Sequence, residues 1–459
     1  MSLSAYDLVV IGAGPGGYVA AARAADLGMK VACVDKGWLG GTCLQVGCIP
    51  SKALLEASHH WAQLQDGLDD QGIVVGDLQL DLAAMMARKN KIVDTMTKGV
   101  GALFKGKGVD YVEGMASLTG SGGVAVEGVG ELQAKRVLLA TGSSPVELPD
   151  LPFDGSRVLS STEVLSLDAV PDKMVVIGAG AIGLEMGSVW SRLGTEVEIV
   201  EFMDVALPGS DADISQQVQR TLKRQGMSFR LSTLAVGAEV QDTGLQLRLA
   251  KRDSDEIETV DCDCVLVSVG RRPHTAGLGL EAAGVALTER GFVTVDNDYR
   301  TTADGVYAIG DVTPGPMLAH KAEAEGVAVV ERMAGMGSSI NYDAIPSVVY
   351  TYPEVASVGQ SEAAARESGF EVRTGTHLFR ANARAHSMNC IDGFVKVVAD
   401  ADSDRLLGVH IFGPQASHLI AEAVVAMEFG GSAEDLARTV HAHPSLSEVV
   451  REAAAAATA

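Results

Sequence analysis

Two cysteines, Cys43 and Cys48, are separated by four residues in a glycine-containing segment, and they could do redox chemistry together. That spacing allows their Cα atoms to come within the roughly 4.4–6.8 Å that a disulfide needs. Lys52 follows closely, and a nearby cation favours the reactive thiolate form of cysteine. Two packed core cysteines, or half of a zinc site, are the alternatives. The flanking glycines and Lys52 suit a reactive pair better, and no second cysteine pair with zinc spacing follows.

The elements that must position this pair contain an internal repeat. The six residues from Val9 to Gly14 recur letter for letter from Val175 to Gly180. Each copy follows an apolar run, completes a Gly-x-Gly-x-x-Gly pattern and opens a helix-like stretch. This arrangement binds a dinucleotide, because the N–H groups and the dipole at the start of the helix favour the pyrophosphate. The cysteine pair begins just after the first copy, which suggests electron transfer between a flavin and a disulfide.

An acidic residue closes the second strand-like run of each copy. Asp35 and Glu201 each lie 18 residues beyond the last glycine of their pattern, at Gly17 and Gly183. Such an acid accepts hydrogen bonds from the adenosine ribose. Glu201 would also repel a 2′-phosphate, and residues 202–204 offer no arginine to bind one. The second copy is therefore predicted to prefer NAD(H) over NADP(H).

Later segments of the chain fit a protein that binds two dinucleotides. Two apolar runs end at Gly142 and Gly270, near the end of each nucleotide module. Asp311 follows another strand-like run and a glycine, where it would bind a ribityl hydroxyl; a helix N-cap is the alternative reading. The helix predicted to begin near Ala319 would direct its N-terminus at the flavin pyrimidine ring.

Composition narrows the class of protein. The chain has 459 residues, 47% of them hydrophobic, and 52 glycines, which is typical of a large α/β protein with three or four domains. Its net charge of −23 argues against nucleic acid and anionic membranes and favours a basic protein partner. Six cysteines do not form a secreted disulfide framework. We find no signal segment and no apolar run of about 20 residues, so we expect a cytoplasmic protein without a membrane partner.

With these motifs the sequence resembles the FAD-dependent pyridine nucleotide–disulfide oxidoreductases over nearly its whole length. The most specific stretches are 40–52, the two glycine patterns, 307–311 and the run His-Ala-His-Pro-Ser-Leu-Ser-Glu at 441–448. Within the family it is most similar to members that oxidise dihydrolipoamide with NAD⁺. Gln45, Asp35 and Ser445 depart from the usual asparagine, glutamate and threonine, and none of them must react.

The resemblance implies an α/β architecture with two Rossmann-like dinucleotide-binding domains, a central domain and a C-terminal α+β dimerisation domain. Their expected ranges are 1–143 for FAD, 144–270 for NAD, 271–342 for the central domain and 343–459 for dimerisation. The implied cofactors are FAD and NAD. The implied partners are a second copy of the chain and the lipoyl domain and E2 component of a 2-oxo acid dehydrogenase complex, or the lipoyl protein of glycine cleavage.

The resemblance also gives each reactive residue a role. Cys43 is the interchange thiol that attacks or is attacked by substrate, and Cys48 is the thiolate against the flavin. His443 is the base, oriented by Glu448, with His441 as its rival. No metal site is implied.

The same resemblance assigns the cofactor contacts. Lys52 is expected near the flavin, paired with Glu185, because a buried lysine needs a carboxylate partner. The full set of implied FAD or NAD contacts is Gly12, Gly14, Gly17, Asp35, Lys52, Gly114, Thr141, Gly142, Gly178, Gly180, Gly183, Glu185, Glu201, Gly270, Asp311 and Ala319.

Other readings are weaker. A glutathione-reductase-like enzyme normally favours NADPH, which Glu201 disfavours. Mercuric and larger thioredoxin reductases carry further redox cysteines near the C-terminus, and none follows Cys390 here. Soluble transhydrogenases need no disulfide pair. A non-catalytic subunit that only holds FAD would have no use for Cys43, Cys48 and His443. His59 and His60 are expected to be a solvated pair. The remaining cysteines are expected to be structural, at Cys33, Cys262, Cys264 and Cys390.

Overall fold

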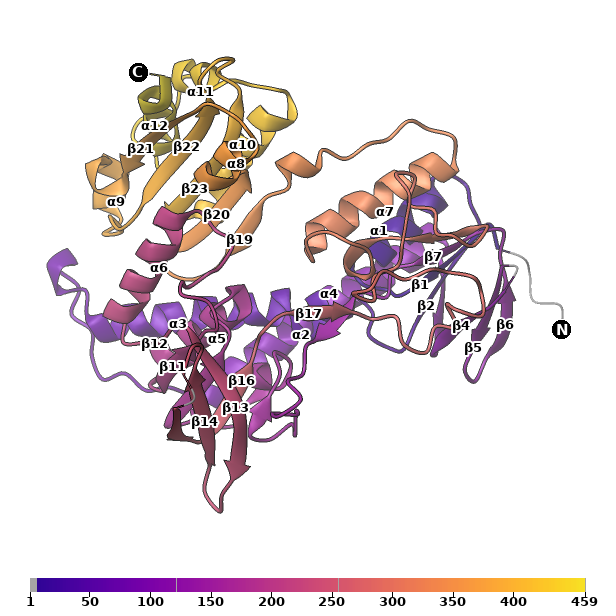
Figure 1. Ribbon diagram of the computed structural model, residues 1–459, viewed down its shortest axis with the longest axis horizontal. Helices are drawn as coiled ribbons and strands as arrows, with labels where there is room; N and C mark the ends of the chain where they lie inside the picture. Colours follow the sequence, from indigo (N-terminus) through magenta and orange to yellow (C-terminus); the bar gives the residue numbers. More distant parts are fainter. Residues whose placement is uncertain (1–5, 121, 255, 459) are drawn as a thin grey trace. The chain divides into compact units, whose positions relative to one another are not determined.

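The computed structural model describes residues 6–120, 122–254 and 256–458 (Figure 1). The chain forms two compact units. The first comprises Met1–Leu54, Ala83–Val146 and Gly270–Ile340, and the second comprises Leu55–Leu82, Glu147–Val269 and Asn341–Ala459. The first unit thus combines most of the predicted FAD segment with the central segment. The second combines the predicted NAD and dimerisation segments with residues 55–82, which were predicted to belong to the FAD segment. The division into four domains stays a prediction.

The first unit is built on a parallel sheet of order β18-β7-β1-β2-β3. Its central strand is buried on both faces, which explains the continuous apolar run in the sequence. Helices α1, α4 and α7 pack on one face, and the small antiparallel sheet β4-β5-β6 packs on the other. Figure 1 shows α1 and α7 side by side. The bounds are β1 Leu8–Ile11, α1 Pro15–Asp26, β2 Val31–Asp35, α4 Leu82–Lys107, β3 Asp110–Glu113, β4 Ala116–Gly120, β5 Gly123–Val126, β6 Gly130–Gln133, β7 Val137–Leu139, β18 Val306–Ala308 and α7 Ala319–Met333.

The second unit contains a parallel sheet of order β12-β11-β10-β16-β9, with the antiparallel sheet β13-β14-β15 packed on one face. The strand that precedes each glycine pattern is central in its sheet, and the strand that ends near its acid is its neighbour. The sequence repeat is therefore a repeat of topology. The bounds are β9 Val158–Leu159, β10 Lys173–Ile177, α5 Ala181–Leu193, β11 Glu196–Val200, α6 Ala212–Arg224, β12 Ser228–Arg230, β13 Thr233–Val240, β14 Leu245–Lys251, β15 Ile257–Cys262 and β16 Cys264–Val267.

An antiparallel sheet of order β19-β20-β23-β22-β21 forms the C-terminal part of the second unit. Helices α10, α11 and α12 pack against it around a core of small and β-branched side chains. Helix α12 approaches closely, since a Cβ on Gly375 would lie 2.2 Å from the carbonyl oxygen of Ala453. The bounds are β19 Ser347–Val349, β20 Glu354–Gly359, α8 Glu362–Glu367, β21 Val372–Leu378, α9 Ala383–Ser387, β22 Phe394–Asp400, β23 Leu406–Gly413, α10 Ala416–Glu428, α11 Ala433–Arg438 and α12 Glu448–Thr458.

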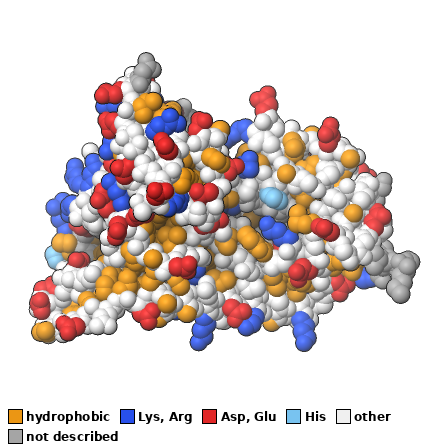
Figure 2. Space-filling view, turned by 90° about the horizontal axis from the view of Figure 1, so that it is seen from below, with side chains coloured by type: hydrophobic (Ala, Val, Ile, Leu, Met, Phe, Trp, Pro, Cys, Tyr) orange, Lys and Arg blue, Asp and Glu red, His pale blue; other side chains and the backbone are white. Residues whose placement is uncertain are grey.

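Five further elements carry much of the predicted site. They are α2 Gly41–Val46, α3 Cys48–Asp66, β8 Ser143–Pro145, β17 Arg271–Pro273 and the 3-10 turn η3 Gly310–Val312. Acidic and basic side chains are interspersed over the face shown in Figure 2. No helix within the described residues is both long and apolar enough to cross a membrane.

Candidate active site

The two reactive cysteines lie on consecutive helices. Cys43 is in α2, and Cys48 is the first residue of α3 after a break at Gly47. Both side chains are partly buried, and the structure holds them as thiols that hydrogen-bond to each other. The pair can therefore close to a disulfide with little movement of the backbone.

The thiols differ in their electrostatic surroundings. The hydrogen bond to Cys48 and then burial raise the pKa of the Cys43 thiol, and Lys52 opposes them. Cys48 stands at the start of α3, where the N–H groups and the helix dipole favour a thiolate. Lys52 follows one turn later on the same helix. These surroundings fit the predicted roles of the two thiols.

Tyr18 and Glu323 are two residues near the thiols that sequence reasoning missed. The Tyr18 hydroxyl donates to Glu323 Oε1 at 3.3 Å, joining α1 to α7. Burial, the Glu323 carboxylate and the charge of both thiols raise the pKa of Tyr18. Glu323 also acts to raise the pKa of Cys43. Tyr18 directly follows the first glycine pattern, and this position is the sequence feature that could have indicated a place near the thiols.

The first glycine pattern forms a cradle that fits a dinucleotide. Gly12 has φ +104°, and a Cβ on Gly17 would lie 1.8 Å from the Gly12 carbonyl oxygen, so helix and strand meet with no room for a side chain. Among the described residues no side chain caps α1 at Gly14, so its N–H groups remain for a phosphate. Asp35 accepts from the Ala13 N–H at 2.9 Å and from the Trp38 N–H at 2.7 Å.

The second glycine pattern repeats this geometry. Gly178 has φ +104°, and a Cβ on Gly183 would lie 2.0 Å from the Gly178 carbonyl oxygen. Gly180 is the N-cap of α5 and faces open space. Glu201, the residue after β11, accepts from the Ala179 N–H at 2.6 Å and from the Met203 N–H at 2.8 Å. Asp35 and Glu201 thus each accept from the N–H of the alanine between the first two glycines of their pattern. Their contacts with ribose stay predictions.

Asp311 lies on η3 and faces two residues that sequence reasoning did not single out. It accepts from the Ser143 hydroxyl at 2.5 Å, and Arg271 Nε donates to that hydroxyl at 2.7 Å. Burial lowers the pKa of Arg271 even though the Asp311 carboxylate opposes this. Asp311 is therefore held by side-chain contacts near the carboxyl end of β7, where a ligand of this fold binds.

The other predicted cofactor residues of the first unit lie on turns around this sheet. Thr141 donates its hydroxyl to the His274 carbonyl at 2.8 Å, and Gly142 has φ +71°. Gly114 follows β3 and donates its N–H to the Asp35 carbonyl at 2.9 Å. Gly270 accepts from the Val146 N–H at 3.0 Å. Ala319 is the first residue of α7, as predicted.

Lys52 and Glu185 belong to different units, and their ion pair stays a prediction. Glu185 lies on α5 and is 5% exposed. Its carboxylate accepts from the Tyr350 N–H at 3.0 Å.

His443 and Glu448 form the predicted pair. His443 Nδ1 lies 2.9 Å from Glu448 Oε1, and the other oxygen of Glu448 accepts from the Ser445 N–H at 2.9 Å. The bonds from Ser445 and His443 lower the pKa of Glu448. An ionised carboxylate only accepts, so Nδ1 carries the proton, and Nε2 is left as the basic atom of a ring that is 75% exposed. This arrangement suits a general base.

His441 is not equipped for that role. Its Nδ1 lies 2.9 Å from the Thr439 carbonyl, and its Nε2 lies 2.8 Å from Glu422 Oε2. Its side chain is 5% exposed. Burial raises the pKa of Glu422, although His441 opposes this. Both ring nitrogens of His441 are already used, which leaves His443 as the candidate.

The other histidine and cysteine predictions have mixed outcomes. His59 is not solvated: its ring centroid lies 3.8 Å from that of Tyr352, and burial first and Arg192 second lower its pKa to about 4. His60 is exposed and lies 3.2 Å from Glu56. The cysteines expected to be structural are buried, at Cys33, Cys262, Cys264 and Cys390. Within the described ranges no group of three or more His, Cys, Asp or Glu side chains is arranged to hold a metal.

Comparison with known proteins identifies the family. Residues 6–326 match the model of the pyridine nucleotide-disulphide oxidoreductases, and residues 345–454 match that family's dimerisation domain. The chain belongs to this family. The first match includes both glycine patterns and the thiol pair, and the second includes the His443–Glu448 pair.

Relatives match the chain over nearly its whole length. It is 48% identical over 455 residues to mitochondrial dihydrolipoyl dehydrogenase of Pisum sativum, covering 98% of this chain and 91% of the relative. It is 49% identical to dihydrolipoyl dehydrogenase 3 of Pseudomonas aeruginosa, covering 98% of each. The solved structure of LpdA from Mycobacterium tuberculosis superposes with a TM-score of 0.90 at 30% identity, covering 98% of this chain and 99% of LpdA.

These findings confirm the predicted family, the α/β fold class, the assignment as an oxidoreductase, and FAD and NAD as cofactors.

Proposed function

We propose that the protein oxidises protein-bound dihydrolipoamide to lipoamide and reduces NAD⁺ to NADH. The observation that carries this proposal is the thiol pair on α2 and α3, built directly against the first glycine cradle. A Cβ on Gly41 would lie 2.5 Å from Gly14 Cα, and Gly40 donates its N–H to the Ala13 carbonyl at 2.9 Å. The names of the full-length relatives support the choice of substrate.

The reaction begins with the Cys43–Cys48 disulfide. His443 Nε2 removes a proton from one substrate thiol, while Glu448 holds Nδ1 and stabilises the charge that develops on the ring. The substrate thiolate attacks the sulfur of Cys43. A new S–S bond forms there, the Cys43–Cys48 bond breaks, and Cys48 leaves as a thiolate.

The second substrate thiol completes the exchange. His443 releases the first proton to solvent and takes the proton of this second thiol, whose thiolate attacks the substrate sulfur bound to Cys43. The lipoamide ring closes, the bond to Cys43 breaks, and the Cys43 sulfur takes the second proton from His443. Substrate has lost two electrons and the cysteine pair has gained them. FAD, when bound, supplies the redox centre that passes this electron pair to NAD⁺ as a hydride. Lys52 and the start of α3 favour the thiolate form of Cys48, which is the form predicted to lie against the flavin.

We further propose that the active enzyme is a homodimer that works with the lipoyl domain and E2 component of a 2-oxo acid dehydrogenase complex. The match of residues 345–454 to a dimerisation domain supports the homodimer. The formal charge of −23 favours a basic docking surface on the partner. The cytoplasmic location stays a prediction, and several relatives are mitochondrial.

Steady-state assays test the proposal. Dihydrolipoamide should support rapid NADH formation with NAD⁺ and little reduction of NADP⁺. Glutathione disulfide with NADPH should give little turnover, and the reverse pattern would indicate a glutathione-reductase-like enzyme.

Glu201→Arg should shift the preference toward NADP⁺ by about tenfold or more, because a hydrogen bond to a charged group is typically worth about 1.5–3 kcal/mol. An unchanged ratio would show that Glu201 does not read the ribose.

A further inference from the structure

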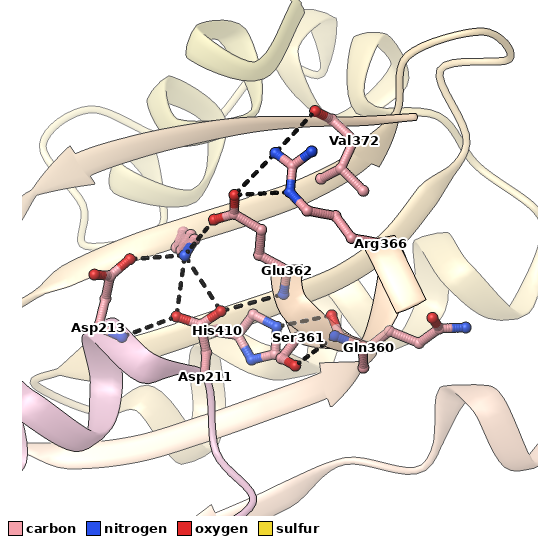
Figure 3. Close-up of polar contacts among 10 residues, drawn as sticks. Asp211, Asp213, Gln360, Ser361, Glu362, Arg366, Val372 and His410 are labelled. Atoms are coloured by element: carbon pink, nitrogen blue, oxygen red, sulfur yellow. Dashed lines mark hydrogen bonds and ion pairs between the residues drawn. The ribbon is translucent and has the colours of Figure 1, made fainter. Parts of the chain in front are cut away.

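Lys396 is a buried lysine on β22 whose ammonium group is bound by three carboxylates. It is 4% exposed. Its Nζ lies 3.1 and 3.2 Å from the two oxygens of Asp211, 2.7 Å from Asp213 Oδ2 and 2.9 Å from Glu362 Oε2. Figure 3 shows Asp211, Asp213 and Glu362 converging in this way. Burial opposes the charge on Lys396, but the three carboxylates raise its pKa.

This cluster links the two parts of the chain that match different family models. Lys396 lies within the dimerisation domain, whereas Asp211 is the N-cap of α6 in the nucleotide-binding part. Asp211 caps α6 by accepting from the Asp213 N–H at 3.2 Å, and it also accepts from the Glu362 N–H at 3.3 Å. Burial acts to raise the pKa of Asp211, but Lys396 holds it below its ordinary value. The first turn of α6 is thus fixed by a charge that another domain provides.

The first turn of α6 also holds the backbone of Leu207 in place. Ser215, one turn after Asp211, donates its N–H to the Asp211 carbonyl at 3.0 Å and its hydroxyl to the Leu207 carbonyl at 3.2 Å. Leu207 has φ +54°, a left-handed conformation that a leucine keeps only when its surroundings hold it. Releasing α6 would therefore release strain at Leu207.

Leu207 is hydrogen-bonded to the second glycine pattern. Its N–H donates to the Ala179 carbonyl at 2.9 Å, and the Ala179 N–H donates to Glu201 at 2.6 Å. The loop 202–210 is consequently tied to the pattern at Glu201 and again at Leu207. Its far end is tied to β22 through Asp211.

We propose that Lys396 is a positioning residue for NAD binding: through Asp211 and Ser215 it holds Leu207 and loop 202–210 against the second glycine pattern. The dimerisation domain thereby sets how tightly the nucleotide module binds NAD. The inference rests on the NAD site of the proposed function.

The test measures binding of ADP-ribose, the part of NAD that this loop would contact, to the full FAD-loaded protein by calorimetry. Lys396→Met should weaken binding about fivefold or more, the lower end of the usual coupling between linked sites. KM for NAD⁺ should rise in parallel, while KM for dihydrolipoamide and kcat at saturating NAD⁺ should not change. A merely structural role would lower the melting temperature without this selective change.

A matched control removes another ion pair of the same sheet. Arg373 on β21 lies 2.7 Å from Asp404, and among the residues that the structure describes it makes no hydrogen bond or ion pair with α6. Arg373→Met should lower stability but leave the Kd for ADP-ribose unchanged. An equal rise in Kd for Arg373→Met would overturn the inference, because general loosening of the domain would then explain both variants.

Milder variants keep the test available if Lys396→Met does not fold. Asp211→Asn retains a good N-cap but loses the charge that Lys396 binds. Ser215→Ala removes only the hydroxyl that holds Leu207. Each should weaken ADP-ribose binding, and combining Ser215→Ala with Lys396→Met should cost less than the sum, because both act through one chain of contacts.

Glu201→Ala distinguishes a failure of the positioning role of Lys396 from a failure of the proposed NAD site. If Glu201→Ala weakens ADP-ribose binding while Lys396→Met, Asp211→Asn and Ser215→Ala do not, the positioning role is wrong and the NAD site stands. If none of these variants changes the Kd, the proposed NAD site is itself wrong and the inference fails with it.

Discussion

Gly41 and Gly14 approach each other so closely that a Cβ on Gly41 would lie 2.5 Å from the Cα of Gly14. Gly41 begins α2, which carries Cys43, and Gly14 is the N-cap of α1 in the first glycine pattern. Gly41 also has φ +61°, which favours glycine. The reactive thiol and the cofactor cradle are therefore placed by one contact between two backbones.

Gly41→Ala should consequently weaken FAD binding. The new methyl group meets backbone that has no flexible end to move, and overpacking of this kind typically costs about 1–3 kcal/mol. We expect the purified variant to carry less flavin per chain, measured by absorbance, and to lose activity in proportion. Gly99→Ala is the control, since a Cβ there meets open space on α4 and no strained φ. Full flavin content in Gly41→Ala would contradict the prediction.

The roles of the two thiols predict different spectra. Adding one two-electron equivalent of reductant should give a long-wavelength absorption band from contact between the Cys48 thiolate and the flavin. Cys48→Ser should abolish the band, because the helix start and Lys52 stabilise charge on that sulfur. Cys43→Ser should keep it. Retention of the band in Cys48→Ser together with its loss in Cys43→Ser would reverse the assignment.

The sequence predicted those features whose residues are close together along the chain. The two glycine patterns and their acids each fall within a few dozen residues, so spacing places them on a strand, a turn or a helix start. The pairing of His443 with Glu448 came instead from the resemblance to the family. The repeated order of the two parallel sheets follows from the same local signal, because each copy encodes a strand, a helix and a second strand.

The sequence could not reveal contacts between distant segments. Tyr18 meets Glu323 across 305 positions, and Lys396 meets Asp211 across 185. A lone lysine in an apolar strand gives no indication of its partners. The prediction that His59 is solvated was wrong for the same reason. The neighbouring His60 suggested exposure, but the distant Tyr352 packs against the ring of His59.

His59 should make stability depend on pH. Its pKa is lowered to about 4, so it stays neutral in the folded protein while the unfolded chain binds a proton near pH 6.5. The unfolded state then binds more protons between those values, so the contribution of His59 is full above about pH 6.5 and falls toward pH 4. His59→Phe should flatten the melting temperature between pH 6.5 and 5 relative to the unmodified protein, measured by calorimetry.

His60→Gln is the matched control, since His60 is an exposed neighbour on the same helix. It should leave most of the pH dependence of the melting temperature in place, because His60 is the smallest of the three causes that lower the pKa of His59. An identical slope in His59→Phe and the unmodified protein would mean that His59 is solvated in solution.

The last prediction concerns which chain supplies the base. The residues that match the dimerisation domain include His443 and Glu448, whereas Cys43 and Cys48 lie in the nucleotide-binding match. We predict that each site takes its cysteines from one chain and its histidine from the partner. Cys43→Ser and His443→Gln homodimers should each be severely impaired, the latter by roughly 10²–10⁴-fold, the usual contribution of a general base.

A heterodimer of the two variants distinguishes the arrangements. If the base comes from the partner, one site collects both substitutions and the other has neither, so about half of the normal activity per dimer returns, because only one of its two sites remains intact. If His443 serves its own chain, each site carries one substitution and mixing restores nothing. Co-expressing the variants with different tags, purifying the doubly tagged dimer and assaying NADH formation gives the answer, with a doubly tagged dimer of unmodified chains as the reference for full activity.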